Sequence, residues 1–194
     1  MGETQLICPP VQDHLTTQVV IVGSGAAGMR TALDLADAGV QTLLVTRGEL
    51  TDSATDWAQG GLAAVWRADD SVDLHVADTL TAGAGLCDEQ AVRTLVTRAP
   101  GALRRLMADG ASFDTDDAGD IDLHLEGGHH ARRILHAGGD QSGHEVEVTL
   151  AHRAGALDVC THARLIDICT DCRGAACGVL VARGGTTVEI SCDH

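Results

Sequence analysis

The clearest hydrophobic pattern in the chain is a run of four β-branched residues near its N-terminus. Val19–Val22 form this run, which is typical of a strand buried in a parallel sheet. The apolar side chains between residues 29 and 38 recur at helical spacing, and Gly39 marks a helix end. Residues 41–45 are again mostly apolar and predict a second strand. The pattern therefore predicts a strand–helix–strand unit at the start of an α/β fold.

Three glycines lie between the first predicted strand and the helix. Gly23, Gly25 and Gly28 have the spacing at which one glycine allows a tight turn, one lets the backbone approach a pyrophosphate and one lets the helix pack close to the strand. The helix N-terminus would face the phosphates with its N–H groups. We predict a dinucleotide site here, with a glycine-rich turn of another α/β protein as the alternative. The predicted contacts are Gly23, Ser24, Gly25, Ala26, Ala27 and Gly28.

The residues after the second strand bear on the choice of cofactor. A typical NAD or FAD site has an acidic residue near position 46, where this chain has Thr46 and Arg47. Arg47 could instead meet the extra phosphate of NADP. A later loop offers hydroxyl, amide and bare backbone N–H groups, which suit a flat, polar, partly anionic ring. Its predicted cofactor contacts are Ala54, Thr55, Asp56, Trp57, Ala58, Gln59, Gly60 and Gly61.

The rest of the chain predicts helices followed by a small sheet. Helices are expected over residues 71–82, 89–109 and 143–156, an acidic turn over 114–122, and a β-meander over about 156–192. Pro100 is expected to break the second of these helices in two. Residues 1–17 are expected to form a loose leader, with two adjacent prolines.

Composition and charge restrict the class of protein. The chain has 194 residues, of which 44% are hydrophobic and 2% aromatic, so we expect a globular domain with an aliphatic core. Neither a signal peptide nor a membrane-spanning run is evident, which favours a cytoplasmic protein. The net charge of −15 argues against binding to nucleic acid or an anionic membrane. An anionic substrate would therefore need a locally positive pocket.

A basic segment is the candidate for such a pocket. Two arginines and three histidines fall within one stretch of eight residues: His129, His130, Arg132, Arg133 and His136. A metal site is disfavoured, because His130 and His136 are six residues apart, and no metal site is predicted. A solvated basic face and a contact with an anion or flavin both stay open.

Seven cysteines add little to the functional interpretation. Cys169 and Cys172 have the spacing of a redox or zinc motif, but no second pair accompanies them and the context of a thioredoxin site is missing. An odd number without a secretory signal argues against a disulfide framework. Cysteine is also a common small buried residue, and a structural metal or disulfide is the less favoured alternative.

Several ordered motifs resemble a known family. Residues 22–28, 46–48 and 58–64 resemble the succinate dehydrogenase and fumarate reductase flavoprotein superfamily. Residues 78–88 and 126–137 are similar, within it, to the L-aspartate oxidases. The resemblance implies an oxidoreductase with a Rossmann-like FAD-binding domain that oxidises L-aspartate to iminoaspartate, the first step of de novo NAD biosynthesis. It implies oxygen or fumarate as the electron acceptor and quinolinate synthase as a candidate downstream partner.

Two positions refine this resemblance. In succinate dehydrogenases a histidine five residues before the glutamine of the Ala-Gln-Gly-Gly motif carries FAD covalently. That position is Ala54 here, so the resemblance implies non-covalent FAD. In L-aspartate oxidases the glutamate of the Glu-Gly-Gly-His motif orients the substrate, which implies that Glu126 pairs with the ammonium group of aspartate. A surface glutamate before a glycine turn is the alternative.

The resemblance also implies a longer protein with a discontinuous FAD-binding domain. We expect residues 18–194 to be the N-terminal part of that domain, with an incomplete parallel sheet and with the capping and helical C-terminal domains absent. We expect these 194 residues alone not to oxidise aspartate, because base, carboxylate clamp and lid would come from elsewhere. The alternatives are a non-catalytic dinucleotide-binding module and another flavin oxidoreductase of the fumarate reductase type.

Overall fold

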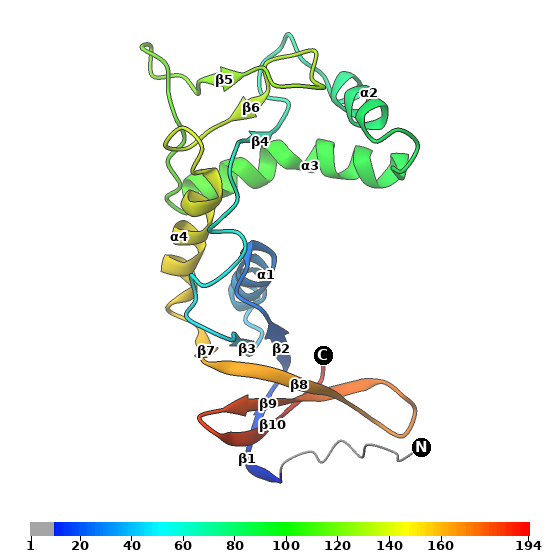
Figure 1. Ribbon diagram of the computed structural model, residues 1–194, viewed down its shortest axis with the longest axis vertical. Coiled ribbons are helices and arrows are strands. Elements are labelled where there is room, and N and C mark those ends of the chain that lie inside the picture. Colours follow the sequence, from blue (N-terminus) through cyan, green and yellow to red (C-terminus); the bar gives the residue numbers. More distant parts are fainter. Residues whose placement is uncertain (1–9) are drawn as a thin grey trace, which may run out of the picture. The chain divides into compact units, whose positions relative to one another are not determined.

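The computed structural model describes residues 10–194, which divide into two compact units (Figure 1). Unit 1 combines the chain up to Ser53 with Leu150–His194. Unit 2 is Ala54–Thr149. The first unit therefore holds both ends of the described chain, and the second is a single insertion in it.

Unit 1 contains the predicted strand–helix–strand start. A three-stranded parallel sheet has the order β2-β3-β7, and α1 connects β2 to β3. The bounds are β2 Val19–Val22, α1 Ala26–Asp37, β3 Thr42–Val45 and β7 Asp158–Cys160. The apolar spacing predicted for α1 is confirmed, since Met29, Ala32 and Leu33 are buried. The parallel sheet predicted from the two apolar runs is thus confirmed, but the predicted burial of the first strand is not, since β2 is only partly buried and Val22 is 46% exposed.

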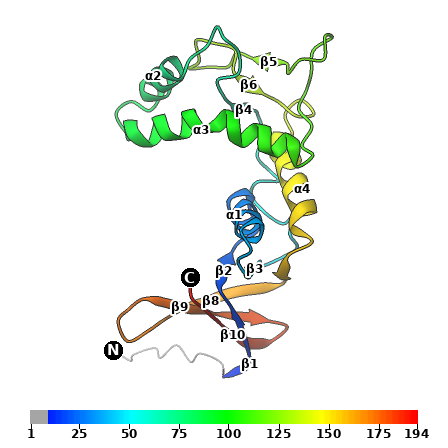
Figure 2. The same ribbon diagram turned by 180° about the vertical axis from the view of Figure 1, so that it is seen from behind.

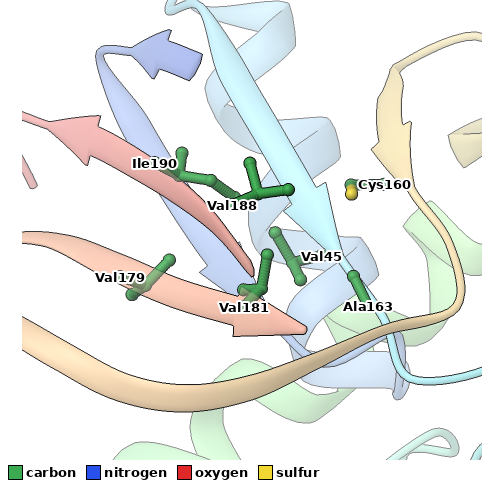
Figure 3. Close-up of a cluster of buried hydrophobic side chains, with 7 residues drawn as sticks. All are labelled: Val45, Cys160, Ala163, Val179, Val181, Val188 and Ile190. Carbon is green, nitrogen blue, oxygen red and sulfur yellow. The ribbon is translucent and has the colours of Figure 1, made fainter. Parts of the chain in front are cut away.

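The second sheet of unit 1 contains the predicted β-meander. Strands β8, β9 and β10 are antiparallel neighbours, and Gly184 and Gly185 turn the chain between β9 and β10 with φ of +57° and +82°. The bounds are β8 Ala163–Thr170, β9 Ala176–Arg183 and β10 Thr186–Cys192. Figure 3 shows side chains of this sheet gathered with Val45 of β3. The buried members of this cluster are Val45, Cys160, Ala163, Val179, Val181, Val188 and Ile190.

Two strands of unit 1 differ from the prediction. Strand β1, Val11–Thr17, lies in the segment expected to be a loose leader, and it pairs in parallel with β10. Most of its side chains are exposed, so the backbone pairing that orders it leaves no hydrophobic pattern in the sequence. Residues 1–9 of the predicted leader, with Cys8, lie outside the described residues. Strand β7, expected in the meander, extends the parallel sheet instead.

Unit 2 is built from helices and a small antiparallel sheet of order β4-β6-β5. Its helix α2 lies alongside α3 (Figure 2). The bounds are β4 Leu62–Ala63, α2 Val72–Ala82, α3 Glu89–Ala108, β5 Leu123–His124 and β6 Ile134–Leu135, and α4, Ser142–Ala154, starts in this unit. The predicted helices are thus confirmed in place. The predicted acidic turn is closed by a single β-bridge between Thr115 and Ile121.

Helix α3 corrects the expectation that Pro100 breaks it. The helix is continuous from Glu89 to Ala108 with Pro100 inside it. Proline removes one backbone donor and crowds the preceding turn. The apolar stripe nevertheless continues on both sides of the proline, with Val96 before it and Leu103 after it, and both are buried. Packing of this stripe outweighs the local penalty.

Among the described residues, none of the helices combines the length and the hydropathy that crossing a membrane requires.

Candidate functional site

The glycine turn of unit 1 has the geometry that a dinucleotide site requires. Gly23 has a φ of +108°, and its N–H donates to the carbonyl of Val45 at 2.8 Å. A Cβ atom on Gly28 would lie 1.9 Å from the carbonyl oxygen of Gly23, so only glycine lets α1 start this close to the turn. Gly25 caps α1 without a side-chain hydrogen bond. The positive end of the helix is therefore not neutralised by its own cap.

Thr46 contributes to the turn itself. The hydroxyls of Ser24 and Thr46 share a hydrogen bond of 2.8 Å, and both side chains are buried. The backbone N–H of Thr46 donates to the carbonyl of Cys160 at 2.9 Å, which fixes the residue at the end of β3. Arg47, by contrast, is exposed. Of these two predicted contacts, only Arg47 presents its side chain to solvent.

The predicted flavin loop of unit 2 takes its shape from the start of α4. The N–H of Gly143 donates to the carbonyl of Ala58 at 3.1 Å, and a Cβ on Gly143 would lie 2.2 Å from the carbonyl oxygen of Thr55. Nδ1 of His144 lies 2.7 Å from Oδ1 of Asp56. The loop is therefore held from one side, while the Trp57 side chain is 82% exposed.

Gly61 of this loop lies directly against β6. A Cβ on Gly61 would lie 2.3 Å from Cγ2 of Ile134, 2.7 Å from the carbonyl oxygen of Leu135 and 3.0 Å from Nε2 of His136. The Gly-Gly pair, which predicted bare N–H groups for a ring, thus also has a packing role. The same contact brings the loop next to a histidine from the basic segment.

That histidine pairs with Glu126. Nε2 of His136 lies 2.8 Å from Oε1 of Glu126, and Nδ1 lies 2.6 Å from the carbonyl oxygen of Gly139. The side chain of Glu126 is 46% exposed and that of His136 only 13%. Sequence reasoning singled out each residue but missed the pair. The signal that could have found it is the β5–β6 hairpin, in which His124 stands opposite Ile134 and brings the flanking residues together.

Arg133 is not available to an anion or a flavin, contrary to the functional interpretation of the basic segment. Its side chain is fully buried. Its Nε and one terminal nitrogen donate to the two carboxylate oxygens of Asp70 at 2.8 and 2.6 Å, and the other terminal nitrogen donates to Asp78 at 2.7 Å. A buried guanidinium requires such partners, so this one belongs to the fold. Arg132 and His130 are exposed.

The same cluster holds Asp78 as an anion. Burial raises the pKa of this carboxyl, but the backbone N–H and ring of His130 and the guanidinium of Arg133 together lower it to about 2. Burial also lowers the pKa of His75, and the charge of Arg133 adds to the effect. The cluster therefore combines the carboxyl groups of Asp70 and Asp78, the guanidinium of Arg133 and the imidazoles of His75 and His130.

The described cysteines show free thiols at every position. Cys160 is buried in the core of unit 1, whereas Cys172 is exposed. Burial and the nearby Glu189 raise the pKa of Cys169, which disfavours the reactive thiolate. Within residues 10–194, no group of three histidine, cysteine or acidic side chains is arranged to hold a metal ion.

Comparison with known proteins adds a family to this geometry. The model of the FAD binding domain family matches residues 18–193. An L-aspartate oxidase of Streptomyces coelicolor is 49% identical over 85% of this chain, and one of Neisseria meningitidis is 41% identical over 91%. Among solved structures, Mycobacterium smegmatis Sdh1 matches 93% of the chain with a TM-score of 0.86 at 25% identity, and so confirms the fold.

The chain corresponds to only part of each of these proteins. It spans 29% of the Streptomyces coelicolor protein, 35% of the Neisseria meningitidis protein and 33% of Mycobacterium smegmatis Sdh1.

The buried carboxylate generates a prediction about stability and pH. The pKa of Asp78 in the folded protein lies below its ordinary value of 3.8, so the ionised carboxyl stabilises the fold. This contribution to the free energy of unfolding is complete above about pH 4 and is lost as pH falls toward 2. At neutral pH this contribution is about 2 kcal/mol. We expect Asp78→Asn, which also removes one of the two negative charges beside Arg133, to lower the free energy of unfolding by about 3 kcal/mol at pH 7.

Urea unfolding at a series of pH values measures this effect. The difference in free energy of unfolding between wild type and Asp78→Asn should become smaller as pH falls from 4 to 2. Asp73→Asn is the matched control, because Asp73 lies on the same helix and is 83% exposed. A gap that stays constant with pH, or an equal loss in the control, would contradict the assignment.

Proposed function

Because the chain belongs to the FAD binding domain family, we propose that it binds FAD non-covalently and serves the oxidation of L-aspartate to iminoaspartate. Oxygen or fumarate is the proposed electron acceptor, and quinolinate synthase the proposed next enzyme. The L-aspartate oxidases that resemble the chain at 41–49% identity support this substrate. The observation that carries the proposal is the position of the Glu126 carboxylate. It contacts His136, and the same histidine lies against Gly61 of the predicted flavin loop.

The glycine turn fits the pyrophosphate of FAD. The close approach at Gly28 and the glycine N-cap of α1, Gly25, bring backbone without bulky side chains to the place where phosphates would be bound. We propose that residues 23–28 hold the pyrophosphate, that Thr46 fixes the turn and that Arg47 lies near the adenosine. Residues 54–61 would contact the flavin. Ala54 has only a methyl group, so it offers no atom for a covalent bond to the flavin.

The chain's own contribution to the chemistry is recognition of the amine. FAD, when bound, would accept the two electrons that aspartate loses when its Cα–H bond is broken. Glu126 is half exposed and carries a carboxylate that can pair with an ammonium group. Succinate has the same two carboxylates as aspartate but no amine, so a partner for the ammonium distinguishes the two substrates. The role of Glu126 is therefore specificity for an amino acid.

The cofactor proposal predicts a specific loss of FAD binding at the turn. Gly28→Ala places a methyl group against the Gly23 carbonyl and should abolish binding, as followed by quenching of flavin fluorescence. Gly101→Ala is the control: it adds the same methyl group inside α3, where nothing lies within 4 Å, and should bind FAD as the wild type does. Arg47→Gln, at an exposed position, should weaken binding without affecting folding. Wild-type affinity in both Gly28→Ala and Arg47→Gln would contradict the proposed site.

The substrate proposal predicts a selective effect of Glu126→Gln. In the FAD-loaded protein of full natural length, kcat/KM for aspartate should fall by about 10- to 100-fold, the value of one charge-assisted hydrogen bond. Reduction of fumarate, which has no amine, should change less than about threefold. Glu89→Gln, at the exposed start of α3, is the control. Equal losses with both substrates would show that Glu126 does not recognise the amine.

A further inference from the structure

The ring of His136 has a hydrogen-bond acceptor at each nitrogen. Nδ1 faces the carbonyl oxygen of Gly139 at 2.6 Å, and Nε2 faces Oε1 of Glu126 at 2.8 Å. A carbonyl oxygen only accepts, so Nδ1 must carry a proton. A neutral ring then has a lone pair at Nε2, directed at a carboxylate oxygen that is also an acceptor. The contact is satisfied only if the pair holds one additional proton.

A ring that donates from both nitrogens accounts for both contacts. Oε1 of Glu126, whose side chain is 46% exposed, is then the acceptor for Nε2.

The His136 ring is fixed by its surroundings. The carboxylate of Asp114 accepts from the N–H groups of Gly138 and Gly139 at 2.9 and 3.0 Å, and the backbone N–H of Asp114 donates to the carbonyl of His136 at 2.8 Å. This holds the Gly139 carbonyl against Nδ1. The His124 ring lies edge-on at 4.8 Å between centroids.

Among the described residues, Asp114, His124 and Glu126 are titratable groups whose contacts reach the His136 ring or the backbone beside it. Asp114 acts through the backbone N–H groups that it binds, and His124 is itself paired with Asp122 at 3.2 Å. Glu126 is the carboxylate in direct contact with the ring. On the remaining side, Gly61 lies so close that a Cβ there would come within 3.0 Å of Nε2. The ring is thus confined between the predicted flavin loop and the carboxylate.

We propose that His136 is a positioning residue that holds Glu126 for the ammonium group of the substrate. It binds Oε1 and leaves Oε2, for which the described residues show no hydrogen bond, as the acceptor for the amine. The side chain that acts on the substrate is Glu126, and His136 acts through it. This inference rests on the proposed function of Glu126.

Nitrogen-15 NMR of histidine-labelled protein tests the pair without any turnover. The Nε2 signal of His136, assigned by its loss in His136→Gln, should carry a hydrogen-bonded proton in the wild type. Glu126→Ala removes the acceptor and should remove this signature. A wild-type Nε2 without a hydrogen-bonded proton, or the same signal in the wild type and Glu126→Ala, would overturn the pairing.

Kinetics of the FAD-loaded protein of full natural length test the positioning role. His136→Ala should raise KM for aspartate by about tenfold or more, with a smaller change in kcat and little change in fumarate reduction. His136→Gln keeps a donor toward Oε1 and should restore most of the loss. The exposed His152→Gln is the surface control.

A double variant separates the two roles. If His136 acts through Glu126, Glu126→Gln/His136→Ala should be no worse than Glu126→Gln alone. The proposal would be overturned if the effects of the two substitutions multiplied in the double variant. It would also be overturned if His136→Gln failed to restore KM. A wild type that does not oxidise aspartate would instead contradict the proposed function, and the NMR measurement would still decide the pairing.

Discussion

The buried guanidinium of Arg133 is the constraint on which unit 2 depends. Its side chain has no exposed surface, yet it carries a full charge, so the fold must bring carboxylates to it. Asp70 supplies two oxygens from the segment before α2, and Asp78 supplies one from within that helix. Ile134, the residue that follows Arg133, starts β6. The hairpin that carries the proposed substrate carboxylate is thereby tied to the α2 helix by the ion pair between Arg133 and Asp78.

Close contacts at glycine residues fix the segments that are proposed to bind the cofactor. Gly28 brings α1 to the Gly23 carbonyl, Gly61 brings the predicted flavin loop to β6, and Gly143 brings the same loop to α4. At each position a methyl group would come within 2.3 Å of another atom. At these three positions the lack of a side chain lets backbone segments pack directly against their neighbours.

Local patterns in the sequence predicted much of this fold. The apolar runs around Gly23 to Gly28 and the helical spacing of α1 are short-range signals, and the corresponding elements were predicted. Strand β1 was missed because it is ordered by pairing with β10, far along the chain, and carries mostly exposed side chains. Pro100 was misjudged because packing on both sides of it outweighs a local penalty.

The candidate site shows the same limit more sharply. Arg133 looked like part of a basic pocket because its partners lie 63 and 55 residues away, and no local pattern encodes such pairs. The pairing of Glu126 with His136 depends on a hairpin whose strands are only two residues long. The chemical roles themselves came from the resemblance to L-aspartate oxidases, and the structure supplied the contacts through which they would act.

The identity of the bound dinucleotide tests the account most directly, because Arg47 in place of an acidic residue also suits NADP. Equilibrium dialysis of the protein against FAD and NADP together, followed by acid precipitation, measures both selectivity and the type of bond. The account predicts that FAD binds, that NADP does not displace it, and that acid releases all the flavin into the supernatant. Displacement of FAD by NADP, or flavin retained on the precipitated protein, would contradict it.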